Sequence, residues 1–212
     1  MWPVGGCFFA ETPDRPVSDA RLFWRADWDS SVVAVDAVPS SSGDADSFDI
    51  GRFADRVTLL RHPDGHESVL FSDGARHLQF EIVSGTVMAG PVRLHYRLSG
   101  FYSIEIQTLS IRRLAQFCRL GRFPLTLCPP ERRAQRWIEM LRAWDGVQAG
   151  AKQRDIAAAL YGDRAAQSLW DDGYRTRVQR LIRAAEGMVG GGYLDLLRRE
   201  EEGKGGPGAG RP

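Results

Sequence analysis

Tyr174-Arg175-Thr176-Arg177-Val178-Gln179-Arg180-Leu181-Ile182-Arg183 is the stretch that decides the architecture of the second half of this chain. Apolar residues recur there at helical spacing and predict a helix over about residues 174–189 with one buried side, formed by Val178, Leu181, Ile182, Ala185 and Val189. The polar residues point elsewhere, with Thr176, Arg180 and Arg183 opposite that side and Arg177 and Gln179 on its two shoulders. Such a helix is expected to pack on its own domain and to face a polyanion.

Further helices are predicted around this one, so residues 129–199 are expected to form an all-α, helix-turn-helix-like domain. The first covers residues 131–147, with an apolar stripe of Ala134, Trp137, Ile138, Leu141 and Trp144. The second covers residues 153–161, with Ile156, Ala159 and Leu160 inward, and ends at Gly162. The connection over 163–173 is longer than a simple turn, which predicts a short additional helical turn there. A short closing helix is expected over 193–199.

The first half of the chain has the pattern of β-strands. Apolar runs at residues 32–38, 57–61, 68–71, 78–82 and 92–98 predict strands, and Asp64-Gly65 and Asp73-Gly74 between them are strong hairpin signals. Residues 103–120 predict a closing helix that Gly121 ends. The expected fold class is therefore α+β, with an antiparallel β-meander domain over residues 1–128. The Gly- and Glu-rich stretch 200–212 is expected to be disordered.

Charge is distributed unevenly along the sequence. Residues 1–108 hold 9 Lys and Arg against 15 Asp and Glu, whereas residues 109–199 hold 17 against 9. This asymmetry indicates that a polyanion-binding part is joined to a part with another task. Sixteen of the 17 cations are arginine, which suits bidentate contacts to phosphate and guanine, although a GC-rich genome would also favour arginine.

Several classes of protein lack support in the sequence. The three cysteines, Cys7, Cys118 and Cys128, are widely spaced, so neither a disulfide framework nor a zinc site is expected, and a reducing cytoplasm fits best. The four histidines have no partners at metal-ligand spacing. No apolar run approaches the length of a membrane span, and the N-terminus is a poor signal peptide. With no phosphate loop or nucleophile elbow, we expect no cofactor, no metal and no enzyme activity.

Several segments carry a family resemblance. They are the stretches 153–162, Arg175 to Ile182 and 191–197, preceded by 23–27, 84–94, 121–124 and 130–133. Together they resemble the RovC-like DNA-binding domain of type VI secretion transcription factors over most of residues 5–199. The resemblance implies a bacterial transcription regulator that works as an oligomer. Longer members carry an additional N-terminal helical segment that this sequence lacks, and some small members antagonise activators.

Two interpretations of the arginine-rich helix remain open. It is either a recognition helix in a major groove of duplex DNA or a solvated charged face, and the resemblance favours the first. The expected DNA contacts are Lys152, Gln153, Arg154, Arg175, Thr176, Arg177, Gln179, Arg180 and Arg183, where the start of the helix at 153 favours an anion. Arg132, Arg133 and Arg136 either contact phosphate or cap the surface.

The sequence therefore predicts a cytoplasmic, homo-oligomeric DNA-binding transcriptional regulator. Its β-rich half is expected to mediate assembly or partner contacts. The alternative is a protein-binding antiactivator that sequesters a related transcription factor. The acidic first half and the absent N-terminal segment motivate this alternative.

Overall fold

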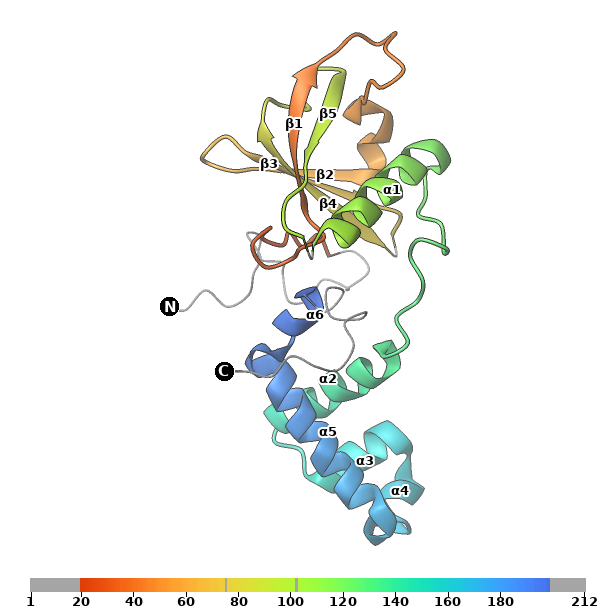
Figure 1. The fold of residues 1–212 in the computed structure, drawn as a ribbon. Coiled ribbons are helices and arrows are strands. Elements are labelled where there is room, and N and C mark those ends of the chain that lie inside the picture. The colour runs from red at the N-terminus through yellow and green to blue at the C-terminus, as the bar shows by residue number, and fades with distance from the viewer. Residues whose placement is uncertain (1–19, 75, 102, 199–212) are drawn as a thin grey trace. The chain divides into compact units, whose positions relative to one another are not determined.

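The computed structural model describes residues 20–74, 76–101 and 103–198 (Figure 1). The predicted disordered tail over 200–212 lies outside these ranges, as do the first 19 residues. The chain divides into two compact units, one of Met1–Pro129 together with Leu197–Pro212 and one of Pro130–Leu196. The first contains a five-stranded, mostly antiparallel sheet and the second contains only helices, so the predicted α+β fold class is confirmed.

The sheet has the strand order β2-β3-β4-β1-β5. Its strands are β1 (Val33–Pro39), β2 (Val57–Arg61), β3 (Glu67–Ser72), β4 (His77–Ser84) and β5 (Val92–Arg97). β2, β3 and β4 form successive antiparallel hairpins, as the two Asp-Gly turns predicted. β1 does not continue a meander, because it lies between β4 and β5, parallel to β4 and antiparallel to β5.

The position of β1 follows from its side chains. Val33, Val35 and Ala37 lie on one face of β1 and are all buried in the core, and both edges of β1 are paired, one with β4 and one with β5. A pure meander would leave β1 at an edge, beside solvent. The first strand among the described residues is therefore a central strand. Hairpin turns do not predict this position, because it results from pairing between residues far apart in the sequence.

One face of the sheet packs against α1 (Ile104–Leu120) and the short 3-10 helix η2 (Ile50–Arg56). Phe117 of α1 is fully buried at the centre of this core. Its ring centroid lies 4.8 Å from that of Phe123, 5.6 Å from Phe71 and 5.7 Å from Phe53. Gly121 ends α1 as predicted, with a φ of 68° and its N–H donating to the carbonyl of Phe117.

The second unit consists of five helices joined by tight turns (Figure 1). They are α2 (Ala134–Gln148), α3 (Gln153–Tyr161), α4 (Asp163–Gln167), α5 (Arg175–Gly187) and α6 (Leu194–Arg198). α4 and the π-helical turn η3 (Trp170–Tyr174) fill the connection between α3 and α5, where an additional helical turn was predicted. A second π-helical turn, η4 (Met188–Gly192), joins α5 to α6.

The core of this unit corrects two predicted helix faces. On α2, Met140 and Ala143 are buried, whereas Ile138 and Leu141 are about half exposed, at 50% and 55%. On α3, Ala157 is buried and the predicted Ala159 is exposed. In both helices the true buried side is rotated from the predicted one. On α2 the large residues Ile138 and Leu141 were favoured over Ala143, whereas on α3 one alanine was chosen in place of another, because residue type alone does not show which small side chain lies where helices approach closely.

No helix among the described residues has the length and apolarity that crossing a bilayer requires.

Phe117→Ala is expected to destabilise the first unit by about 3–5 kcal/mol, because it leaves a cavity among three aromatic rings. The control is Leu125→Ala, since Leu125 is 58% exposed and its truncation is expected to change stability by less than about 0.5 kcal/mol. Urea unfolding followed by circular dichroism measures both variants. Equal stability of the two variants would contradict the assignment of Phe117 to the core.

Burial raises the pKa of the Cys118 thiol from its ordinary 9.0 to about 11, and nearby Arg52 lowers it less strongly. Because only the thiolate reacts, Cys118 is expected to be alkylated at pH 8 roughly 100-fold more slowly in the folded protein than in urea. The rate should rise with pH until about pH 11. Peptide mass spectrometry after iodoacetamide treatment measures this rate. Equal rates in the folded and unfolded chain would show that the thiol is accessible and ionised normally.

Candidate nucleic-acid interface

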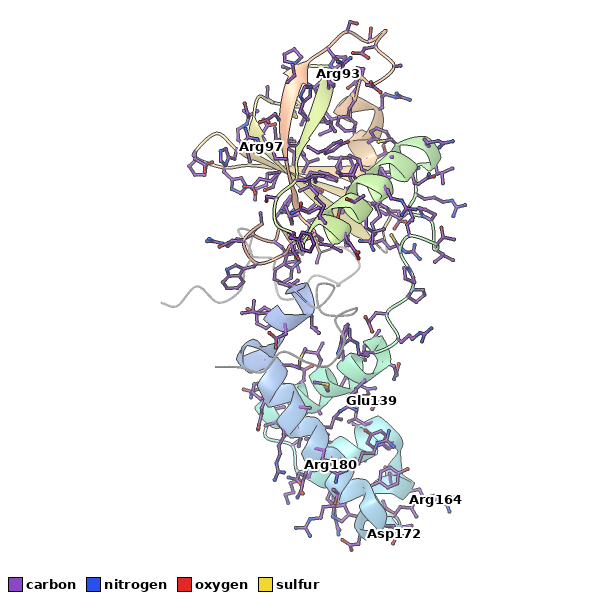
Figure 2. All side chains as sticks on the ribbon, viewed as in Figure 1. Arg93, Arg97, Glu139, Arg164, Asp172 and Arg180 are labelled. Carbon is purple, nitrogen blue, oxygen red and sulfur yellow. The ribbon has the colours of Figure 1, made fainter. Side chains whose placement is uncertain are left out.

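α5 has one buried and one solvent-facing side. Val178, Leu181 and Ala185 are at most 6% exposed and pack in one core with residues of α2 and α3. The predicted solvent-facing residues Arg175, Thr176, Arg177, Arg180 and Arg183 are all exposed, and Gln179 is half-buried. The predicted division of this helix into an apolar and a cationic side is present in the structure, except that Val189, predicted on the buried side, is 43% exposed and lies in η4 beyond the end of α5. Figure 2 labels Arg180 on α5.

Net charge alone does not distinguish the second unit. Residues 130–196 hold 11 basic against 9 acidic side chains, a net of +2. Much of the cationic excess expected for this part of the chain belongs instead to α1 and the residue after its cap, at Arg112, Arg113, Arg119 and Arg122. Any attraction of the second unit for a polyanion must therefore come from where its arginines lie.

Several arginines of the second unit have partners within the unit. Arg133 pairs with Glu131 at 3.0 Å and lies over the ring of Trp137. Arg142 donates to the carbonyl oxygen of Ala159 at 3.1 Å. Arg154, a predicted DNA contact, has its guanidinium carbon 5.6 Å from the centre of the Trp170 ring. These contacts stabilise the helical unit and reduce the freedom of these side chains to meet a ligand.

Arg177 is the most strongly held of the predicted contacts. Its guanidinium carbon lies 4.2 Å from the centre of the Tyr161 ring, and its Nη2 is 3.9 Å from Oε2 of Glu139. The Tyr161 hydroxyl donates to the same oxygen at 3.2 Å. Burial is the largest cause of a raised pKa for this phenol, with Arg177 lowering it and Glu139 raising it. The phenol therefore remains a donor at neutral pH.

Other arginines face solvent without such partners. The guanidinium groups of Arg136, Arg175, Arg180 and Arg183 make no ion pair or hydrogen bond to a described residue, and all four side chains are exposed. Arg180 and Arg183 are one helical turn apart on α5, so their guanidinium groups start from the same side of the helix. Their guanidinium donors are not used by the described residues.

The start of α3 meets the middle of α5. Gln179 of α5 donates from its side-chain amide to that of Gln153 at 3.4 Å, so two predicted contacts from different helices adjoin. Lys152 precedes α3 and is exposed. Its backbone N–H donates to the carboxylate of Asp155 at 3.1 Å, which places a negative charge at this helix start. This carboxylate weakens the attraction of the α3 N-terminus for a phosphate.

Two carboxylates precede α5. Asp171 and Asp172 are exposed in η3, just before Arg175, and Figure 2 labels Asp172 there. Negative side chains at a helix start stabilise the helix through its dipole. They also offset the positive charge of Arg175, so the middle of α5 is more cationic than its beginning.

A shallow hollow of about 610 Å³ lies between α2 and α5. Its lining contains three arginines and one carboxylate, from residues Arg136, Glu139, Tyr161, Gly173, Thr176, Arg177, Arg180 and Leu181. Three predicted contacts, Thr176, Arg177 and Arg180, thus share one surface. Glu139 and Tyr161 were missed by the sequence analysis, although the three-residue spacing of Arg136 and Glu139 places both on one face of α2.

Within the described part of the chain, no three His, Cys, Asp or Glu side chains gather as metal ligands would.

Comparison with known families identifies the second half of the chain. Residues 103–198 match the family described as the DNA-binding domain of type VI secretion transcription factors. The match begins with α1 of the first unit and continues through the helical unit. Among curated proteins, none matches the chain. The resemblance expected from the sequence is therefore confirmed over residues 103–198, which are similar to the RovC-like DNA-binding domain of type VI secretion transcription factors, while the stretches at 23–27 and 84–94 lie outside the match.

Proposed function

We propose that this protein is a transcriptional regulator that holds duplex DNA against the outer side of α5. The observation that carries the proposal is the pair Arg180 and Arg183, exposed and without partners among the described residues, on a helix whose opposite side is buried. The family match supports DNA as the partner. An α-helix about 10–12 Å wide fits a major groove about 12 Å wide.

The predicted contacts take different roles in this proposal. Arg180 and Arg183 donate to guanine edges or to phosphates, with Thr176 beside Arg180 in the same hollow. Gln179 reads a base edge from the junction with Gln153. Arg175 and Lys152 contact flanking phosphates at the starts of α5 and α3. Arg154 and Arg177 act mainly by holding the helices together, through Trp170 and through Tyr161 with Glu139.

α3 and α5 form a helix-turn-helix-like pair in this proposal. α4 and η3 replace the short turn of the simple motif, and α5 is the reading helix. The hydrogen bond between Gln153 and Gln179 holds the start of α3 beside the middle of α5. Both helices therefore present polar side chains to the same duplex.

We assign the sheet-containing first unit to assembly or partner contacts in the bacterial cytoplasm. Exposed apolar side chains occur near the end of β5 and the start of α1, at Tyr96, Leu98 and Ile104. Such side chains are suited to a protein partner. If the assembly is a symmetric homo-oligomer, the DNA site should be repeated or palindromic.

Arg180→Ala/Arg183→Ala is expected to weaken duplex binding by at least about 10-fold, since each base-contacting arginine contributes about 1–3 kcal/mol. The measurement is binding to a pool of genomic duplex fragments over a range of salt concentrations. The slope of log affinity against log salt should fall by about 0.9 for each phosphate that the double variant no longer neutralises.

The matched control is Arg52→Ala/Arg164→Ala, which removes the same charge from exposed positions in η2 and α4. Equal affinity of the two double variants would exclude α5 as the DNA-binding helix. If the unaltered protein binds no duplex but captures a larger protein of its own family, the antiactivator alternative replaces the proposal.

A further inference from the structure

The hollow between α2 and α5 contains charged side chains from both helices. If α5 alone contacted DNA, the charges contributed by α2 would have no role. Arg136 of α2, a helix outside the proposed pair, joins Arg177 and Arg180 of α5 in its lining. Glu139 is the one carboxylate among these lining residues, so the hollow carries a net charge of +2. Figure 2 labels Glu139 on α2 and Arg180 on α5.

The arginines of the hollow differ in how far they are already engaged. Arg177 is held by the Tyr161 ring and by Glu139, at a separation of 3.9 Å from the carboxylate oxygen. Arg136 and Arg180 make no hydrogen bond or ion pair to a described residue. Two guanidinium groups with free donors, approaching from two helices, provide the geometry that phosphate oxygens accept.

We propose that this hollow is a phosphate subsite for the backbone of duplex DNA, in which Arg136 and Arg180 hold the phosphate and Glu139 limits its affinity. The subsite rests on the proposed function, because the phosphate belongs to the duplex that α5 reads. The Thr176 hydroxyl, which also lines the hollow, supplies a further donor.

Glu139 has two opposing effects in this arrangement. It accepts the hydroxyl of Tyr161 at 3.2 Å and keeps Arg177 against the phenol ring, which orders the wall of the hollow. Its negative charge repels an incoming phosphate. Backbone contacts are independent of sequence, so a carboxylate that weakens one of them lowers binding to specific and non-specific duplexes alike.

Arg136→Ala tests the phosphate contact. It is expected to weaken duplex binding by about 3- to 10-fold for specific and non-specific fragments alike, and to reduce the salt slope by about 0.9. Arg164→Ala is the matched control, since Arg164 is exposed on α4, has no partner among the described residues and does not line the hollow. Equal affinities and slopes of these two variants would overturn the subsite.

Glu139→Gln tests the opposing charge without removing the acceptor for Tyr161. It is expected to strengthen binding to non-specific duplex by about 3-fold or more. A modest reduction in the repulsion between residue 139 and the phosphate is enough for such a change. Glu186→Gln is the control, because it makes the same charge change at an exposed position of α5 away from the hollow. If both glutamine variants bind equally, Glu139 does not limit affinity.

The two proposals fail in distinguishable ways. Absence of duplex binding by the unaltered protein would overturn the proposed function and the subsite with it. Duplex binding that is abolished in Arg180→Ala/Arg183→Ala but unchanged in Arg136→Ala would retain α5 as the reading helix and overturn the subsite alone. Circular dichroism of each variant shows whether the helical unit remains folded.

Discussion

The burial of Val178, Leu181 and Ala185 under α2 and α3 is the constraint on which the helical unit depends. A helix turns about 100° per residue, so fixing these three positions also fixes the directions of all the others. Arg180 and Arg183 face solvent because the core leaves them no other direction. The exposure of these arginines is therefore a consequence of the packing of α5, and rotating this helix would bury them and disrupt the core together.

The arginines of the helical unit divide into two groups by environment. Arg142, Arg154 and Arg177 contact carbonyl, aromatic or carboxylate groups of neighbouring helices. Arg136, Arg180 and Arg183 have no such contacts among the described residues. Residues 130–196 carry a net charge of only +2, so under the proposed function this division matters more for binding than the number of arginines does. Internal partners hold some cations in place and leave a smaller set on one surface.

The sequence predicted the helices well because their caps and periods are local. Gly121 and Gly162 end α1 and α3, and the side of α5 that Val178 and Leu181 bury follows from spacing alone. The sequence analysis failed where packing between residues far apart in the chain decides the structure. The central position of β1, the burial of Ala143 and Ala157, and the contact of Arg177 with Tyr161 and Glu139 all depend on residues brought together only by folding. The predicted contacts themselves remain predictions until DNA binding is measured.

The segment shared with the family and the segment that folds as a unit have different boundaries. The family match begins at Ser103 and includes α1, yet Leu114 and Phe117 of that helix are buried in the core formed with the sheet. A fragment of residues 103–198 would therefore expose the apolar face of α1 that the sheet covers in the whole chain. Such a fragment is expected to aggregate. A fragment from Pro130 onward would keep the whole helical core. The helix at the start of the matched segment therefore depends, in this chain, on residues that lie outside the match.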